Sequence, residues 1–172
     1  YPKVTTHILD VLEKHGVCAT FFVLGSRVEG REEVLLRMEA LGCEIGNHTF
    51  SHADLTRLSA EQCKEEIDKT NAEFERALGH PASVVRPPYG FYNAAVRKNV
   101  PYPLVLWTVD TNDWRPRNVA ELAGAVVREA EDGCVILMHD QQSSTAQAMD
   151  AIIPALVAKG FRFVTVSELI AA

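Results

Sequence analysis

Short apolar runs alternate with helical patterns along the whole chain, and this alternation is the strongest constraint on the fold. A helical pattern over residues 4–15 precedes an apolar run at 17–24, and the same order recurs up to the C-terminus. The runs are largely apolar on consecutive positions, which is typical of strands buried on both faces. The sequence therefore predicts a parallel sheet covered by helices, either a doubly wound sheet or a β/α barrel.

Six strands are expected from these runs. They lie at residues 17–24, 43–46, 84–85, 104–109, 134–138 and 161–166. The helices between them should begin at capping residues, namely Ser59, Asn93, Asn118 and Ser167. Gln62, three residues after Ser59, completes a capping box. Pro154 lies inside a helical pattern, which predicts a kink or a split in that helix.

Length and charge limit the classes of protein to consider. The 172 residues suit one domain spanning residues 1–172, but a complete (β/α)8 barrel typically needs about 250 residues, so a barrel here should be compact or incomplete. The formal net charge of −6 argues against a nucleic-acid partner. No apolar run reaches the ~18 residues of a membrane span. The four cysteines form no Cys-x-x-Cys pair, which favours buried thiols.

Polar clusters follow four of the predicted strands. His48 and His52 follow the second strand, segment 86–90 follows the third, segment 110–114 follows the fourth, and His139 follows the fifth. In parallel β/α folds, functional side chains gather at the carboxyl ends of the strands. We therefore expect these four clusters to lie along one edge of the sheet and to form the functional site.

His48 and His52 are candidate metal ligands. Neutral imidazole is the commonest metal ligand, and two residues spaced four apart project to the same side of the chain. Two histidines make half of a tetrahedral zinc site, and a catalytic zinc needs a third protein ligand. Asp54 is near in sequence, but its position before Leu55 favours a turn or a cap, so the third ligand is left open.

The segment Arg86-Pro-Pro-Tyr-Gly90 is expected to be a rigid loop, because consecutive prolines restrict the backbone. Such a loop would fix the direction of the Tyr89 and Gly90 N–H groups, which could stabilise an oxyanion. Arg86 could orient a carboxylate with its planar guanidinium group. The alternative is an ordinary turn between a strand and a helix, with Arg86 on the surface.

Asp113 and His139 follow neighbouring strands and are expected to pair. A carboxylate partner favours the protonated imidazole, which is the form that a general acid needs. Trp114 and Leu137 offer apolar walls for a small group or a sugar ring. No function is expected for the histidines on or beside helices, His7, His15 and His80.

Taken together, these motifs resemble those of the polysaccharide deacetylases, the NodB-homology group of carbohydrate esterase family 4. Four of that family's five motifs are matched, by His48-Thr-Phe-Ser-His52, Arg86-Pro-Pro-Tyr-Gly90, Asp110-Thr-Asn-Asp-Trp114 and Leu137-Met-His139. Segments 19–25 and 160–167 also look like this family, so the resemblance covers essentially the whole chain. It implies a distorted, compact (β/α) barrel of the NodB-homology type that removes acetyl groups from sugar polymers with a divalent metal.

The resemblance implies roles for the residues of the first two matched motifs. His48 and His52 would bind the metal, which is zinc in the first place, with cobalt, nickel or manganese as alternatives. Arg86 would orient the catalytic base. The Tyr89 N–H would help to hold the oxyanion.

The two later motifs would supply the general acid and the acetyl pocket. Asp113 would tune His139, the general acid, and Trp114 and Leu137 would line the pocket. Segment 110–114 looks most like deacetylases of N-acetylglucosamine polymers, such as peptidoglycan or chitin-type chains. The alternatives are an acetylxylan esterase and a non-catalytic glycan-binding relative. The family implies action at the cell envelope or outside the cell.

The family's first motif has no counterpart in this chain. That motif, Thr-Phe-Asp-Asp-Gly, lies on the first barrel strand and supplies the catalytic base and the third metal ligand, and no Asp-Asp pair occurs in the 172 residues. We therefore expect a catalytic domain whose first strand is missing from this chain, with the base supplied by an upstream fragment of the same polypeptide. The alternatives are a segment left out of the chain and an inactive relative.

Overall fold

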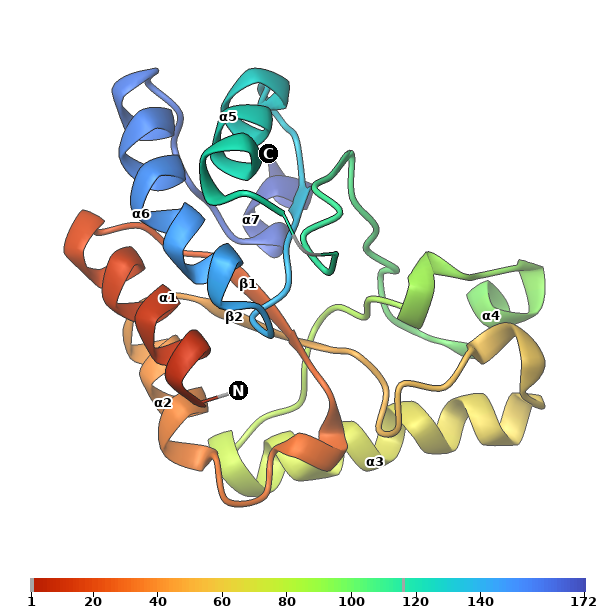
Figure 1. Ribbon diagram of the computed structural model, residues 1–172. Coiled ribbons are helices and arrows are strands. Elements are labelled where there is room, and N and C mark those ends of the chain that lie inside the picture. Colours follow the sequence, from red (N-terminus) through yellow and green to blue (C-terminus); the bar gives the residue numbers. More distant parts are fainter. Residues whose placement is uncertain (1, 116) are drawn as a thin grey trace. The chain divides into compact units, whose positions relative to one another are not determined.

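Helices and parallel strands alternate in the computed structural model, as the sequence predicts (Figure 1). The structure describes residues 2–115 and 117–172. They form two units, each built from two stretches of chain. The larger unit comprises Thr20–Leu106 and Thr165–Ala172, and the smaller unit comprises residues 2–19 and Trp107–Val164.

The larger unit contains a parallel sheet. Strand β1 (Thr20–Val23) pairs with β2 (Glu44–Asn47). Single parallel bridges continue this sheet from Asn47 to Val85 and from Val85 to Leu104. The strands predicted to begin at residues 84 and 104 are therefore present here as single bridges, which is shorter than expected.

The helical segments of the larger unit follow the predicted pattern. They are η1 Gly25–Arg27, α2 Glu32–Ala40, η2 Leu55–Arg57, α3 Ala60–Leu78, η3 Pro88–Gly90, α4 Ala94–Asn99 and α7 Val166–Ala171. The capping box at α3 is confirmed, because the Ser59 hydroxyl accepts the Gln62 N–H and the Gln62 side chain accepts the Ser59 N–H. Asn93 caps α4 as predicted, through a hydrogen bond from the Val96 N–H.

The predicted cap at Ser167 is wrong, because α7 begins earlier. Thr165 caps this helix: its hydroxyl accepts the Glu168 N–H, and Glu168 accepts the Thr165 N–H. Ser167 lies in the first turn, and its N–H and hydroxyl donate to Glu44 of β2. The first turn of α7 is thus attached to the sheet by side-chain hydrogen bonds.

The core of the larger unit includes one face of α3. Cys63 and Ile67 of α3 are at most 2% exposed and pack with Leu55, Val85, Val96 and Val100. Full burial of a large aliphatic side chain stabilises a fold by roughly 1.5–3 kcal/mol. Cys43 and Cys63 are buried, as expected, whereas Cys18 and Cys134 are partly exposed.

The smaller unit combines helices with a short parallel pair of strands. Strand β3 (Val109–Asp110) pairs with β4 (Ile136–Leu137), so the strand predicted at 134–138 is present but shorter. The helices are α1 (Pro2–His15), α5 (Val119–Glu129) and α6 (Ser143–Ala158). Helix α6 lies against both α1 and α5 (Figure 1).

The sequence predicted a kink or a split at Pro154, and the split is wrong. Helix α6 continues through Pro154 to Ala158. Ile152, Ile153 and Leu156 are at most 2% exposed, and burial of these side chains keeps the segment helical although proline cannot donate a backbone hydrogen bond. Asn118 caps α5 as predicted.

The strand predicted at 161–166 is not found. Residues 161–165 belong to no helix or strand, and Val166 already lies in α7. A segment is a strand only where a neighbouring segment shares its backbone hydrogen bonds, and within residues 2–115 and 117–172 no neighbour forms such a ladder here.

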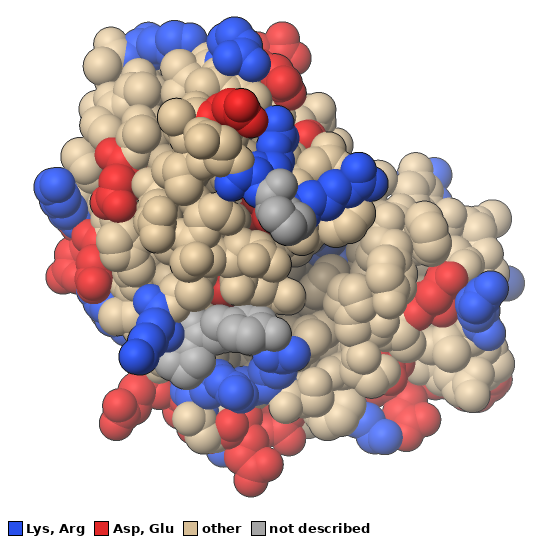
Figure 2. All heavy atoms as spheres, in the orientation of Figure 1, with Lys and Arg blue, Asp and Glu red and all other residues tan. Residues whose placement is uncertain are grey.

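The surface carries charges of both signs. Figure 2 shows that uncharged residues make up most of the face in view, with acidic and basic side chains scattered over it. The net charge of −6 is therefore not produced by one acidic area on that face. In the described part of the chain, no helix is long and apolar enough to cross a membrane.

Candidate active site

The loop after β2 carries the two histidines predicted to bind a metal. Nδ1 of His48 donates to the carbonyl oxygen of Arg86 at 2.7 Å. This hydrogen bond fixes the tautomer, so that Nε2 of His48 carries the lone pair that a metal ligand needs. The ring centroids of His48 and His52 are 5.0 Å apart. The larger unit therefore brings the two predicted ligands together.

The two histidines could form only part of a metal site. Two neighbouring imidazoles suit zinc, cobalt or nickel, because these metals accept nitrogen ligands. Within residues 2–115 and 117–172, no group of three or more His, Cys, Asp or Glu side chains is arranged to hold a metal. Asp54 is a capping residue, as expected: its carboxylate accepts the Thr56 N–H and hydroxyl at the start of η2.

The loop after Val85 fixes Arg86 in the interior of the larger unit. The guanidinium group donates to the carbonyl oxygens of Val105 at 3.3 Å and Leu106 at 2.9 Å, and it lies 4.1 Å from the centre of the Phe22 ring. Burial lowers the pKa of Arg86 to about 10, so the group stays positively charged at neutral pH. Arg86 is only 8% exposed, and the alternative of a surface arginine is wrong.

The backbone at Tyr89 has an unusual conformation, with a φ of 61°. The Gly90 N–H, one of two candidate donors to an oxyanion, already donates to the Pro87 carbonyl. In the part of the chain that is described, the Tyr89 N–H has no acceptor. The exposed Tyr89 ring packs edge-on against His52, with centroids 4.7 Å apart. Tyr89 is therefore the better candidate donor of the two.

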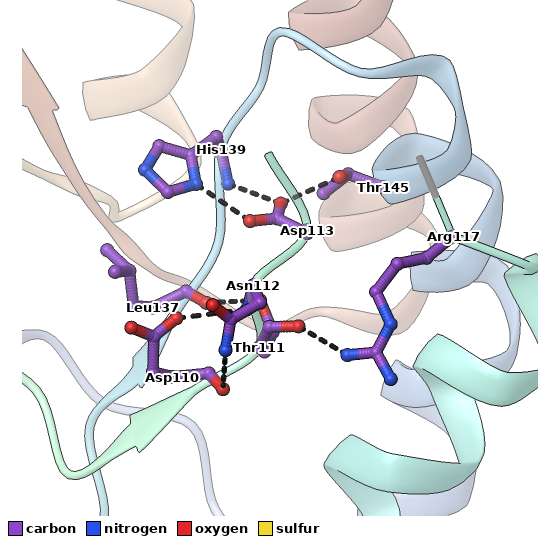
Figure 3. Close-up of polar contacts among 8 residues, drawn as sticks. All are labelled: Asp110, Thr111, Asn112, Asp113, Arg117, Leu137, His139 and Thr145. Carbon is purple, nitrogen blue, oxygen red and sulfur yellow. Dashed lines mark hydrogen bonds and ion pairs between the residues drawn. The ribbon is translucent and has the colours of Figure 1, made fainter. Parts of the chain in front are cut away.

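Asp113 and His139 form a pair in the smaller unit, as predicted. Asp113 is fully buried, and its Oδ1 lies 2.7 Å from Nδ1 of His139 (Figure 3). Its Oδ2 accepts the His139 N–H and the Thr145 hydroxyl, both at 2.7 Å. Thr145 could not be predicted as part of this pair, because a threonine in the first turn of a helix resembles any polar residue at a helix start.

The electrostatics of this pair favour its charged form. The hydrogen bond that His139 donates to Asp113 raises the pKa of His139, burial opposes the rise, and the negative charges of Asp113, Asp110 and Asp140 add to it. Burial by itself raises the pKa of Asp113, but hydrogen bonds from His139 and Thr145 outweigh it and leave that pKa below its ordinary value. The pair therefore favours the protonated imidazole of His139, whose Nε2 points away from the carboxylate (Figure 3).

The two remaining predicted site residues of this unit are Leu137, the last residue of β4, and Trp114, four residues after the end of β3. Leu137 is buried, and its carbonyl accepts the Thr111 hydroxyl at 2.7 Å (Figure 3). Trp114 is 51% exposed, and the Arg115 guanidinium lies 4.3 Å from the centre of its ring. One predicted apolar wall thus lies in the interior and the other on the surface of the smaller unit.

A family model described as polysaccharide deacetylase matches residues 1–102. Among curated proteins, the chain is similar to peptidoglycan-N-acetylmuramic acid deacetylase PdaC of Bacillus subtilis, with 44% identity over 98% of this chain and 36% of that protein. It is also similar to peptidoglycan-N-acetylglucosamine deacetylase PgdA of Listeria monocytogenes, with 37% identity over 97% of this chain and 36% of that protein. The chain thus spans about a third of the length of these relatives.

Solved structures of the same group superpose closely. The structure of peptidoglycan deacetylase PdaC from Bacillus subtilis has a TM-score of 0.95 at 43% identity, covering 99% of this chain and 85% of that chain. A family 4 acetyl xylan esterase from Clostridium thermocellum, solved with a cobalt ion, has a TM-score of 0.94 at 35% identity, with the same two coverages.

These similarities confirm the predicted fold class, a distorted (β/α) barrel of the NodB-homology type. The roles of the individual site residues stay predictions. Because the family model matches more than half of the 172 residues, the chain belongs to the polysaccharide deacetylase family.

Proposed function

We propose that this chain removes acetyl groups from the N-acetylated sugars of peptidoglycan by metal-assisted hydrolysis. The observation that carries the proposal is the buried Asp113 carboxylate, which holds the His139 ring at 2.7 Å and favours its protonated form. The names of PdaC and PgdA, which refer to N-acetylmuramic acid and N-acetylglucosamine in peptidoglycan, support this substrate class. They also support a location at the cell envelope or outside the cell.

His48 and His52 are the proposed ligands of the divalent metal. The tautomer of His48 and the 5.0 Å between the two ring centroids support this role. The cobalt ion in the related esterase supports a site for divalent metals, and we propose zinc first, with cobalt, nickel or manganese as alternatives. A bound metal of this kind supplies a Lewis acid for the acetyl carbonyl and lowers the pKa of water.

Groups of this chain would stabilise the oxyanion and protonate the leaving nitrogen during hydrolysis. Water adds to the carbonyl carbon of the acetamide, and the Tyr89 N–H donates a hydrogen bond to the resulting oxyanion. As the carbon–nitrogen bond breaks, Nε2 of His139 gives its proton to the sugar nitrogen, so acetate and a free amine leave. Trp114 and Leu137 are the proposed apolar surface for the acetyl methyl group.

The base that takes the proton of the attacking water is not assigned to any of these 172 residues, since they contain no Asp-Asp pair. In the family this pair belongs to the first motif. We propose that an upstream segment of the same polypeptide supplies it, and that Arg86 orients its carboxylate. The burial of Arg86 and its retained positive charge support that role.

The test measures acetate released by the full-length protein from N-acetylated glycan strands of peptidoglycan, from N-acetyl chitin oligosaccharides and from acetylated xylan. We expect release from the N-acetylated substrates. Exchange of His139→Ala should lower the rate by about 10²–10⁴-fold, the usual contribution of a general acid. His7→Ala is the matched control, because His7 also pairs with an aspartate, Asp150, but lies exposed on α1.

Each other outcome contradicts a definite part of the proposal. Release from xylan alone would favour an acetylxylan esterase, which the similarity to the Clostridium enzyme makes the second candidate. Binding of glycans without any acetate release would favour a non-catalytic glycan-binding relative. Full activity of the His139→Ala variant would remove His139 from the role of acid.

A further inference from the structure

The 48–52 loop holds two residues in a strained backbone conformation. Thr49 has a φ of 68° and His52 a φ of 66°, values that residues other than glycine rarely adopt. Such conformations persist only where the surrounding structure fixes them. The loop that carries both proposed metal ligands must therefore be held by other groups of the larger unit.

Part of this support comes from the end of β2. The side-chain oxygen of Asn47 accepts the Thr49 N–H at 2.9 Å, and the Thr49 hydroxyl accepts the His52 N–H at 3.1 Å. Asn47 and Thr49 are fully buried. The Asn47 amide group donates in turn to the Ile67 carbonyl and to the side chain of Asn71, both in α3 and both at 3.0 Å.

A second part comes from η1. The Gly25 N–H donates to the Thr49 carbonyl at 3.0 Å, and the Ser26 N–H donates to the Phe50 carbonyl at 3.2 Å. These bonds fix two carbonyl groups of the loop. The N–H groups of Phe50 and Ser51, in the middle of the loop, take no part in these bonds and need other acceptors.

Glu66 of α3 accepts both of these amides. Its Oε2 lies 2.9 Å from the Phe50 nitrogen and 2.9 Å from the Ser51 nitrogen, and its Oε1 accepts the Ser51 hydroxyl at 2.9 Å. One half-buried carboxylate thus makes three hydrogen bonds to the two residues between Thr49 and His52. Hydrogen bonds to a charged acceptor are stronger than those to a neutral one.

We propose that Glu66 is a positioning residue for the metal site. Its carboxylate fixes the backbone between His48 and His52, so both imidazoles are held in place before a divalent metal binds. The inference rests on the proposed metal role of the two histidines. Without the carboxylate, the amides of Phe50 and Ser51 would lose their acceptor, and the strained backbone at His52 could relax away from His48.

The test compares Glu66→Ala with Glu65→Ala in the full-length protein. Glu65 is the neighbouring residue of α3 and forms an exposed ion pair with Lys69 at 2.6 Å, so it is the matched control. We expect Glu66→Ala to weaken the binding of Zn²⁺ or Co²⁺, measured by calorimetry, by about 10–100-fold, the usual effect of removing a partner that supports a metal ligand. Glu65→Ala should bind as tightly as the wild type.

Hydrogen exchange of the metal-free protein gives a second readout. The amides of Phe50 and Ser51 should exchange faster in Glu66→Ala than in the wild type or in Glu65→Ala, because they have lost their acceptor. Glu66→Asp, which shortens the side chain by one methylene and keeps α3 intact, should show a smaller loss of both affinity and protection. If Glu66→Ala does not fold, Glu66→Asp takes its place in both measurements.

The outcomes separate this inference from the proposed function. If the wild type binds neither Zn²⁺ nor Co²⁺, the metal role of the histidines fails and this inference fails with it. If the wild type binds metal and both Glu66 variants bind it equally tightly, only the positioning role is overturned. Unchanged exchange at Phe50 and Ser51 would also overturn it.

Discussion

At the scale of single residues, the protonation of His139 depends on one buried carboxylate. Asp113 accepts three hydrogen bonds and carries a negative charge without solvent contact. The raised pKa of His139 keeps its imidazole protonated to a higher pH than that of a free histidine. The range of pH in which the chain can act as an acid should therefore be set by Asp113.

Exchange of Asp113→Asn should move the alkaline limb of the pH–rate profile to lower pH. The variant removes the negative charge that raises the pKa of His139, so the imidazole loses its proton earlier as the pH rises. Above the lowered pKa, acetate release should fall about tenfold for each pH unit, because only the protonated fraction reacts. The measurement is kcat for acetate release as a function of pH.

The free energy of unfolding should also fall as the pH rises. Because the pKa of His139 in the folded protein lies above its unfolded value of about 6.5, the protonated ring contributes its full stability below that pH, as long as Asp113 stays ionised. This contribution is lost as the pH rises through the raised pKa. Asp150→Asn, which removes the exposed partner of His7, is the control.

An unchanged alkaline limb of the pH–rate profile in Asp113→Asn would show that Asp113 does not raise the pKa of the acid.

The residues of the candidate site could be predicted where a motif placed them at a strand end. Asp113 and His139 follow β3 and β4, and their pairing follows from the parallel register of those strands. Thr145 and Glu66 could not be predicted, because they project from helices whose orientation depends on packing. Gly90 was predicted as an oxyanion donor, but its N–H is used within its own turn.

At the scale of elements, Gly25 shows how closely η1, the 48–52 loop and α3 approach one another. A Cβ at this position would lie 2.7 Å from the Phe50 ring and 2.8 Å from the Cα of Thr70. The Thr70 backbone belongs to the middle of α3 and cannot move away without moving the helix. Glycine is therefore required here for space and not for its backbone conformation.

Exchange of Gly25→Ala should lower the free energy of unfolding by about 1–3 kcal/mol, the usual cost of overpacking. Gly124→Ala is the matched control, since a Cβ there would meet only the Arg128 guanidinium at 3.4 Å, at the end of a flexible side chain. In helix α5, alanine should stabilise the protein by roughly 0.5–1 kcal/mol relative to glycine. Urea unfolding measures both changes, and equal effects of the two exchanges would contradict the argument.

Helix boundaries were predicted better than strands for a physical reason. A capping box such as Ser59 with Gln62 is local, so both partners stand in the sequence. A strand depends on a partner far along the chain, which explains why 161–166 reads as a strand but forms no ladder among the described residues. The split expected at Pro154 was also wrong, because burial of the neighbouring side chains outweighs the tendency of proline to end a helix.

At the scale of the whole molecule, metal binding should add to stability. A metal that binds only the folded protein raises its free energy of unfolding by about 2.7 kcal/mol when present at 100 times its dissociation constant. We expect Zn²⁺ to raise the midpoint of thermal unfolding of the full-length protein, and a chelator to reverse the change. The double variant His48→Ala, His52→Ala should lose this response.

The matched control for that experiment is His80→Ala. His80 also lies in the larger unit, where it pairs with Glu39 at 2.8 Å on the surface. This variant should respond to Zn²⁺ as the wild type does. An equal response of the double variant would show that the metal binds elsewhere.

The division of each unit into two stretches of chain has a consequence during protein synthesis. Helix α1 is translated before its neighbour α6, which begins only at Ser143, after nearly all of the larger unit. Leu9 and Leu12 of α1 are each 1% exposed in the folded protein. While residues 16–142 are being translated, the nascent chain therefore carries the apolar face of α1 without this neighbour, and exposed apolar surface of this kind is what chaperones bind.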